Sequence, residues 1–286
     1  MLIGIEEALQ QEKPSVVLVE GDTNSVLAGA LAAAKLHIPI GHVEAGLRSY
    51  DRTMPEEINR IITDHLSTYL FAPTSLARDI ALKEGINPKS ISLTGNTIVD
   101  AITLYKKKAL QSTFLKKYEL EKQQYILVTA HRAENVDYAD KLQNIFSGLR
   151  LLAQETKLPI IYPLHPRTKK FLTTYAIQVP KEVQLIDPLG FFDFLQAELF
   201  ACLVLTDSGG VQEETCVLGV PCVTLRENTE RPETLTIGSN ILAGTDPQKI
   251  LSCSLAMLAK KTTWKQPFGD GKAGQHILNH LQSILK

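Results

Sequence analysis

The sequence predicts an α/β protein built on parallel β-sheets. Short β-branched runs alternate with helical stretches along the chain. Runs such as 16–19 and 203–205 are apolar at every position, which is typical of strands that helices cover on both faces. With 286 residues and 44% hydrophobic composition, the chain is long enough for about two domains, each with its own core.

The first block opens with a strand at 15–20, an Ala-rich helix at 26–36 and a strand at 38–43, which together predict a βαβ unit. Further strands are expected where short apolar runs recur, at 69–71, 91–94, 125–129, 159–163, 183–185, 202–206 and 222–225. Helices are expected between them, at 55–64, 98–108, 137–155, 191–197, 210–218 and 276–284.

A domain boundary is expected in the segment 106–124, which is the least apolar part of mid-chain and is rich in Lys, Gln and Glu. The turn-rich segment 264–274 precedes the final amphipathic helix. From the residues alone, this helix could pack on either block.

Composition excludes several classes of partner. Thirty basic and thirty-one acidic residues leave a net charge of −1, so no overall positive field attracts nucleic acid or an anionic membrane. The apolar run 26–34 is too short to cross a bilayer, and the first residues lack the basic flank of a signal peptide, which favours the cytoplasm. Four cysteines without a Cys-x-x-Cys pair predict buried free thiols, with no disulfide and no metal site.

Three carboxylates follow predicted strands or open a helix in the first block: Asp22, Glu44 and Glu56. Each has a structural alternative. Asp22 could cap a helix, Glu44 could form a salt bridge with Arg48, and Glu56 could be stabilised by the dipole of the helix whose first turn it occupies. Ligands gather at the carboxyl ends of parallel strands. Three carboxylates at one such edge would repel one another unless protonation or a bound partner offsets the charge.

Polar residues also follow the strands of the second block. The pair His131-Arg132 could hold a phosphate, or the imidazole could exchange a proton near neutral pH. The turn Ser208-Gly209-Gly210 leads from an apolar strand into a helix, whose free N–H groups suit an anion. Arg231 follows the next strand and is a candidate for bidentate contact with a diphosphate. His165-Pro166-Arg167 could either cap a helix or contact a ligand.

In combination, six segments resemble the non-hydrolysing UDP-N-acetylglucosamine 2-epimerases, in order and spacing, from about Lys13 onward. The segments are 21–25, 42–48, 55–60, 131–132, 207–214 and 229–233. The resemblance implies the GT-B type of fold, with two Rossmann-like domains facing across a cleft and the last helix returning to the first domain. The domains are then expected at 1–110 with 268–286, and at 111–267.

The resemblance implies interconversion of UDP-N-acetylglucosamine and UDP-N-acetylmannosamine, by anti elimination of UDP to 2-acetamidoglucal and re-addition, without a cofactor. It implies catalytic roles for Asp22, Glu44, Glu56 and His131. We expect Asp22 and Glu56 to be the acid–base pair and Glu44 to stabilise the elimination transition state. Substrate-binding roles are implied for Arg60, Arg132, Ser208, Gly209, Gly210, Glu214 and Arg231. The implied partners are a UDP-sugar and a second copy of the chain in a homodimer.

The chain departs from the family pattern at its start, where members carry a strand and a Gly-Thr-Arg-Pro-Glu-like turn. We therefore expect the first domain to lack its N-terminal part. Alternative functions are epimerisation of a related UDP-diacetamido sugar, hydrolytic release of N-acetylmannosamine, glycosyl transfer, or nucleotide-sugar binding by an inactive fragment.

Overall fold

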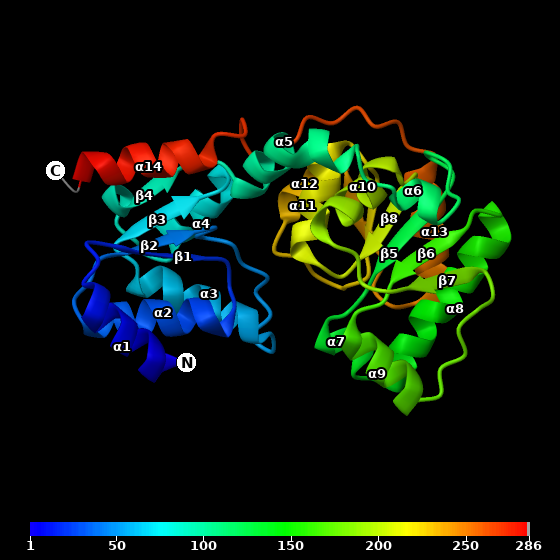
Figure 1. Ribbon diagram of the computed structural model, residues 1–286, viewed down its shortest axis with the longest axis horizontal. Helices are drawn as coiled ribbons and strands as arrows, with labels where there is room; N and C mark the ends of the chain where they lie inside the picture. The colour runs from blue at the N-terminus through cyan, green and yellow to red at the C-terminus, as the bar shows by residue number, and fades with distance from the viewer. Residues whose placement is uncertain (285–286) are drawn as a thin grey trace. The chain divides into compact units, whose positions relative to one another are not determined.

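The computed structural model describes residues 1–284 and contains two compact units. One unit comprises Met1–Ala101 with the segment from Pro267, and the other comprises Ile102–Gln266 (Figure 1). That these units are two Rossmann-like domains with limits at 1–110 with 268–286 and at 111–267 stays a prediction. The predicted α/β class is confirmed, because every strand pair in both units is parallel.

The first unit holds a four-stranded sheet in the order β1-β2-β3-β4. Its strands are β1 (Val17–Glu20), β2 (Ile40–Val43), β3 (Tyr69–Ala72) and β4 (Ile91–Leu93). Its helices are α1 (Leu2–Glu12), α2 (Asn24–Lys35), α3 (Pro55–Leu66), α4 (Ser75–Lys83), the short 3-10 turn η1 (Pro88–Ser90) and α14 (Ala273–Ile284), while α5 (Thr97–Ala109) crosses the division between the units.

The two faces of this sheet are covered by helices from opposite ends of the chain (Figure 1). Val26 and Ala30 of α2 pack against Ile40 on one face. Ile277 and Leu281 of α14 pack with Val43 on the other. The last helix, which the sequence allowed on either block, therefore packs on the first unit. Its apolar residues Ile277 and Leu281 contact an apolar face of the sheet of that unit.

The second unit holds a six-stranded sheet in the order β10-β9-β8-β5-β6-β7. Its strands are β5 (Ile126–Thr129), β6 (Ile160–Pro163), β7 (Val183–Ile186), β8 (Leu203–Thr206), β9 (Cys222–Thr224) and β10 (Asn240–Leu242). Its helices are α6 (Phe114–Lys117), α7 (Ala133–Val136), α8 (Ala139–Thr156), α9 (Pro166–Thr174), α10 (Phe191–Phe200), α11 (Gly209–Leu218), α12 (Pro232–Thr236) and α13 (Pro247–Leu258).

Residues of β5 alternate between two apolar clusters. Ile126 and Val128 join the cluster that includes Leu149, whereas Leu127 joins the cluster that includes Val211. Every residue of β5 and β8 is buried, as their continuous apolar sequences predict for a sheet covered on both faces.

The four cysteines are free thiols; Cys216 and Cys222 are buried, as predicted, whereas Cys202 and Cys253 are only partly buried. None of the helices described between residues 1 and 284 has the length and apolar character needed to cross a membrane.

Parallel register brings the strand ends together. Glu20 of β1 is level with Val43 of β2, and Thr129 of β5 is level with Thr206 of β8. The segments that follow these strands therefore leave each sheet at a shared edge, where ligands of α/β proteins bind.

Two glycines with nearly the same backbone conformation give a matched stability test. Gly46 has φ +84°, and a Cβ there would lie 2.2 Å from the carbonyl oxygen of Ala77 in α4. Gly85 has φ +86°, and a Cβ would meet nothing within 4 Å. We expect Gly85→Ala to cost about 1–2 kcal/mol of unfolding free energy through its left-handed backbone alone. Gly46→Ala should cost about 1–3 kcal/mol more, because backbone must move. Urea unfolding of both variants measures the difference, and equal losses would contradict the steric account.

Candidate functional site

Asp22 lies directly after β1 and forms an ion pair with Arg60 of α3. Arg60 donates from Nε and Nη2 to Asp22 Oδ2, at 3.0 and 2.6 Å. The N-cap of α2 is Thr23, whose hydroxyl accepts from the backbone N–H of Val26 at 3.4 Å. The alternative interpretation of Asp22 as a helix cap is therefore wrong. Its carboxylate remains 26% exposed and available to a ligand.

Glu44 lies in the turn that follows β2 and adopts a left-handed backbone conformation, with φ +68°. Its carboxylate oxygen Oε2 lies 4.0 Å from the place where a Cβ on Gly21 would be, so it is near the segment that carries Asp22. A non-glycine residue in this region costs about 1–2 kcal/mol, and such strain concentrates at functional sites. The helical spacing that a Glu44–Arg48 pair would need is absent, because residues 44–46 form a turn.

Glu56 is partly buried in the first turn of α3, and its neighbour Glu57 is buried. Glu57 accepts hydrogen bonds from the backbone N–H groups of Ser49 and Tyr50, each at 2.9 Å. Arg60 Nη1 also donates to Glu57, at 2.8 Å. Arg60 therefore joins the β1 loop to the segment before α3 through two carboxylates.

His42 on β2 is a buried imidazole with an acceptor at each ring nitrogen. Nδ1 lies 2.6 Å from Asp64 Oδ1, and Nε2 lies 2.9 Å from the carbonyl oxygen of Gly21. Because a carboxylate and a carbonyl only accept, both ring nitrogens must carry hydrogen, which makes the ring an imidazolium. Burial lowers the pKa of His42, but the hydrogen bond and charge of Asp64 outweigh burial, so the pKa is raised.

Asp64 of α3 extends this network to the turn that carries Glu44. Its Oδ2 accepts from the backbone N–H of Gly46 at 3.1 Å and pairs with Arg48 Nη1 at 2.7 Å. Arg48 is also paired with Glu84, through Nε at 2.9 Å. His42 thus binds the loop that carries Asp22, through Gly21, and Asp64 binds the turn that carries Glu44, through Gly46.

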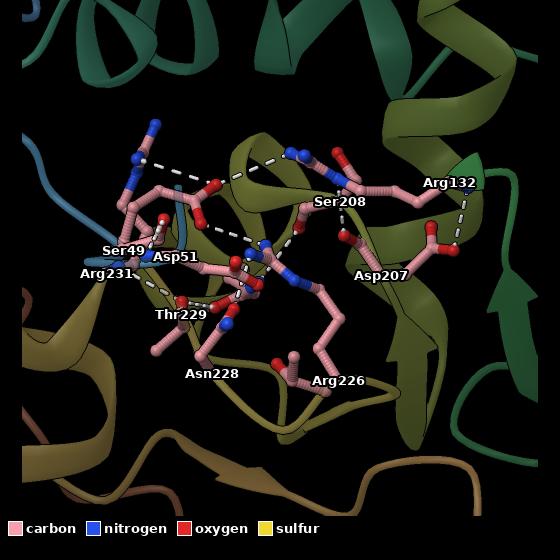
Figure 2. A network of polar contacts seen from close by, with 12 residues as sticks. Ser49, Asp51, Arg132, Asp207, Ser208, Arg226, Asn228, Thr229 and Arg231 are labelled. Atoms are coloured by element: carbon pink, nitrogen blue, oxygen red, sulfur yellow. Dashed lines mark hydrogen bonds and ion pairs between the residues drawn. The ribbon is translucent and has the colours of Figure 1, made fainter. Parts of the chain in front are cut away.

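In the second unit, buried Asp207 follows β8 and binds the loop that follows β5. Its carboxylate accepts from the backbone N–H groups of His131, at 3.0 Å, and Arg132, at 2.9 Å. It also accepts from Asn135 Nδ2 at 3.0 Å. Figure 2 shows Arg132 extended past Asp207, to whose carbonyl oxygen its Nε donates at 3.1 Å.

The His131 side chain is 40% exposed, and its Nδ1 lies 3.7 Å from Asp207 Oδ1. Burial lowers the pKa of His131, the charges of His165 and Arg132 lower it further, and Asp207 opposes them. The ring is therefore neutral at pH 7 and can donate one hydrogen bond and accept another. His165 itself caps α9 by accepting from the backbone N–H of Arg167 at 3.1 Å, which is the capping role considered from the sequence.

The turn Ser208-Gly209-Gly210 opens α11, with Ser208 at the N-cap. The Ser208 side chain makes no capping hydrogen bond, and the N-terminus of a helix favours a bound anion. A Cβ on Gly209 would lie 2.4 Å from Glu230 Oε1, so a larger residue there would displace a carboxylate that pairs with Arg226 and Arg132. Glu214 lies one turn further along α11 and is partly buried.

Three arginines gather around the buried Glu230. Arg226 Nη1 pairs with Glu230 Oε2 at 2.8 Å, and Arg132 Nη2 lies 3.4 Å from Oε1. Arg231 at the N-cap of α12 lies 3.9 Å from the same carboxylate and pairs through Nε with Glu213. Figure 2 shows Arg226 and Arg231 on the connection between β9 and α12, and Arg132 on a different segment. Such a cluster suits a diphosphate.

The structure thus brings the predicted residues together within each unit. Asp22, Glu44, Glu56 and Arg60 share one sheet edge in the first unit, while His131, Arg132, Ser208 and Arg231 share one in the second. That the two sets face each other stays a prediction.

Sequence reasoning missed the residues that hold these loops, which are His42, Glu57, Asp64, Asp207 and Glu230. One signal could have found two of them, because Glu57, Arg60 and Asp64 recur at helical spacing and form one buried face of α3.

The imidazolium of His42 predicts a pH-dependent stability. A raised pKa means that the stabilisation is complete below the unfolded pKa of 6.5 and is lost as pH rises through the folded value. We expect unfolding free energy to fall by about 1.4 kcal/mol for each unit of pKa difference. His42→Gln should remove this dependence in urea unfolding between pH 6 and 9. His65→Gln, at a half-exposed histidine on α3 next to Asp64, should keep it. Parallel pH curves for wild type and His42→Gln would rule out the imidazolium.

A family model described as UDP-N-acetylglucosamine 2-epimerase matches residues 1–282. The chain is 50% identical to the UDP-N-acetylglucosamine 2-epimerase of Methanocaldococcus jannaschii, over 98% of this chain and 79% of the relative. It is 42% identical to the UDP-2,3-diacetamido-2,3-dideoxy-D-glucuronate 2-epimerase of Pseudomonas aeruginosa, over 99% of this chain and 79% of the relative.

Among solved structures, the M. jannaschii UDP-GlcNAc 2-epimerase in complex with UDP-GlcNAc and UDP superposes with a TM-score of 0.95. This comparison covers 99% of the chain and 79% of that structure, at 50% identity. The predicted GT-B type of fold is confirmed by this likeness. On the family model and on these identities, the chain belongs to the UDP-N-acetylglucosamine 2-epimerase family.

Proposed function

We propose that this chain interconverts UDP-N-acetylglucosamine and UDP-N-acetylmannosamine. The observation that carries the proposal is the carboxylate set at one sheet edge, where Asp22 is fixed by Arg60 and Glu44 is held in a strained turn. The relatives support the substrate, since one 50% identical protein carries that activity in its name and its solved structure contains UDP-GlcNAc and UDP.

The second unit binds the nucleotide in this proposal. Arg132 and Arg231 hold the diphosphate oxygens, together with the N–H groups of the Ser208-Gly209-Gly210 turn, which Ser208 does not cap. Glu214 accepts hydrogen bonds from the ribose hydroxyls. Burial lowers the pKa of His131, so its imidazole is neutral. In this proposal the neutral ring donates a hydrogen bond to the departing phosphate.

The first unit carries out the chemistry on the sugar. A carboxylate removes the C2 proton, and the electron pair forms a C1–C2 double bond as the bond from C1 to the UDP oxygen breaks. The products are 2-acetamidoglucal and UDP, and the reverse addition with protonation on the other face of C2 gives the epimer. We assign Asp22 and Glu56 to the two faces of C2, and Glu44 to the positive charge that develops at C1. The overall change is redox-neutral.

Amide variants test these roles. Asp22→Asn, Glu44→Gln and Glu56→Gln should each lower kcat at least about 100-fold, because each removes acid–base or electrostatic stabilisation of the transition state. The dissociation constant for UDP should stay within about threefold, since UDP is bound by the other unit. Turnover is measured by separation of the two UDP-sugars, and binding by calorimetry. Glu6→Gln on exposed α1 is the control. Near-normal turnover in all three variants would refute the assignment.

A second candidate substrate is UDP-2,3-diacetamido-2,3-dideoxy-D-glucuronate, because a 42% identical relative is named for it. Comparison of kcat/KM for the two UDP-sugars decides between them, and we expect UDP-N-acetylglucosamine to be preferred. Release of free N-acetylmannosamine with UDP would indicate the hydrolytic reaction. Binding of UDP without turnover of either sugar would indicate a binding protein.

We extend the proposal to a homodimer located in the cytoplasm. Light scattering after size-exclusion chromatography should give twice the 31.6 kDa chain mass, and the monomer mass would overturn the dimer.

A further inference from the structure

Glu198 is a buried carboxyl group that the proposed mechanism does not use. It lies on α10 and is 0% exposed. Neither of its oxygens receives a hydrogen bond from any residue in the described range 1–284. A buried carboxylate without donors costs several kcal/mol, so the group must be neutral or must share a proton.

The acidic group that interacts with Glu198 is Glu214 on α11, a helix that packs against α10. Two ionised carboxylates would repel each other and offer only acceptors. With one proton between them, the same contact becomes a hydrogen bond. Burial raises the pKa of both Glu198 and Glu214, and the charge of Glu214 raises that of Glu198 further.

The other titratable groups that interact with Glu198 cannot replace that proton. The Tyr125 hydroxyl donates to the carbonyl oxygen of Ala197 at 2.5 Å. Burial raises the pKa of Tyr125, and it raises that of the Cys222 thiol to about 12, so both are neutral. Since neither oxygen of Glu198 has a hydrogen-bond donor within the described residues, protonation is the available way to hold this group.

We propose that Glu198 is a positioning residue: it donates its proton to Glu214 and fixes that carboxylate for the cis-diol of a nucleotide's ribose. This inference rests on the proposed function, in which Glu214 accepts the ribose hydroxyls. One oxygen of Glu214 accepts from Glu198, and the remaining acceptor positions are left for the two hydroxyl groups. A carboxylate acceptor of fixed orientation discriminates ribose from deoxyribose, because charge-assisted hydrogen bonds are stronger than neutral ones.

The test compares UDP with 2′-deoxy-UDP. Calorimetry on the whole chain should show that wild type binds UDP at least about 10-fold more tightly, as expected when a hydrogen bond to a charged group is lost. Glu198→Gln should keep this ratio within about twofold, because its amide N–H donates to Glu214 in place of the carboxyl proton. Glu198→Leu, which has no donor, should lower the ratio at least about fivefold. A Glu198→Leu protein that keeps the wild-type ratio overturns the proposal.

If Glu198→Leu does not fold, infrared difference spectra still test the proposal, because they detect the protonated carboxyl group directly. At pH 7.5, wild type minus Glu198→Gln should show the C=O band of one protonated carboxylic acid, which shifts in D₂O. Absence of that band overturns the proposal.

Glu214→Gln separates this inference from the proposed function. It should weaken UDP binding and lower the preference for ribose. An unchanged preference overturns the inference, since Glu214 would not contact the ribose. Epimerisation of UDP-N-acetylglucosamine by wild type is measured independently and decides the proposed function.

Discussion

In each unit, a buried carboxylate with several N–H donors fixes the loops at the carboxyl edge of a parallel sheet. Asp64 binds His42, Arg48 and the N–H of Gly46, and Asp207 binds the N–H groups of the loop after β5. Removing one partner of such a buried charge typically costs 3–5 kcal/mol, because the remaining charge is uncompensated. This cost holds each loop in one conformation.

The arrangement supports electrostatic catalysis, which depends on charges that are in place before the reaction. The His42 imidazolium and the Asp64 carboxylate bind the loops that carry Asp22 and Glu44. These loops therefore do not have to reorganise as charge develops on the substrate. The left-handed conformation of Glu44 fits the same account, since strain persists only where surrounding contacts impose it. The arginines of the second unit are likewise fixed by ion pairs to Glu213 and Glu230.

The sequence predicts the strands well because buried parallel strands are apolar at every position, as β5 and β8 show. Other elements lacked such signals. The three-residue strand β10 is too short for a periodic pattern, and α1 buries none of its residues. The helix α13 had a signal that was overlooked, because Asp246 before Pro247 is an N-cap that accepts from two backbone N–H groups.

For the site, the sequence indicated which polar residues follow the strands, but not which of them are anchors. Glu56 and Glu57 are adjacent and chemically identical, yet Glu57 is buried and binds the preceding loop whereas Glu56 is only partly buried. The residue that caps α2 is Thr23, and not Asp22 as one interpretation of the sequence held. The partner of Glu198 could not be predicted either, because Glu214 is sixteen residues away and meets it only through helix packing.

The central claim is that carboxylates of this chain break and re-form the C2–H bond of a UDP-sugar while the bond from C1 to UDP opens. Incubation with UDP-N-acetylglucosamine in D₂O, followed by proton NMR of both UDP-sugars, tests it most directly. The account predicts one deuterium at C2 in each epimer, together with migration of an ¹⁸O label from the C1–O–P bridge into the terminal phosphate oxygens. Retention of the C2 proton and of the bridging label in an epimerising sample would contradict it.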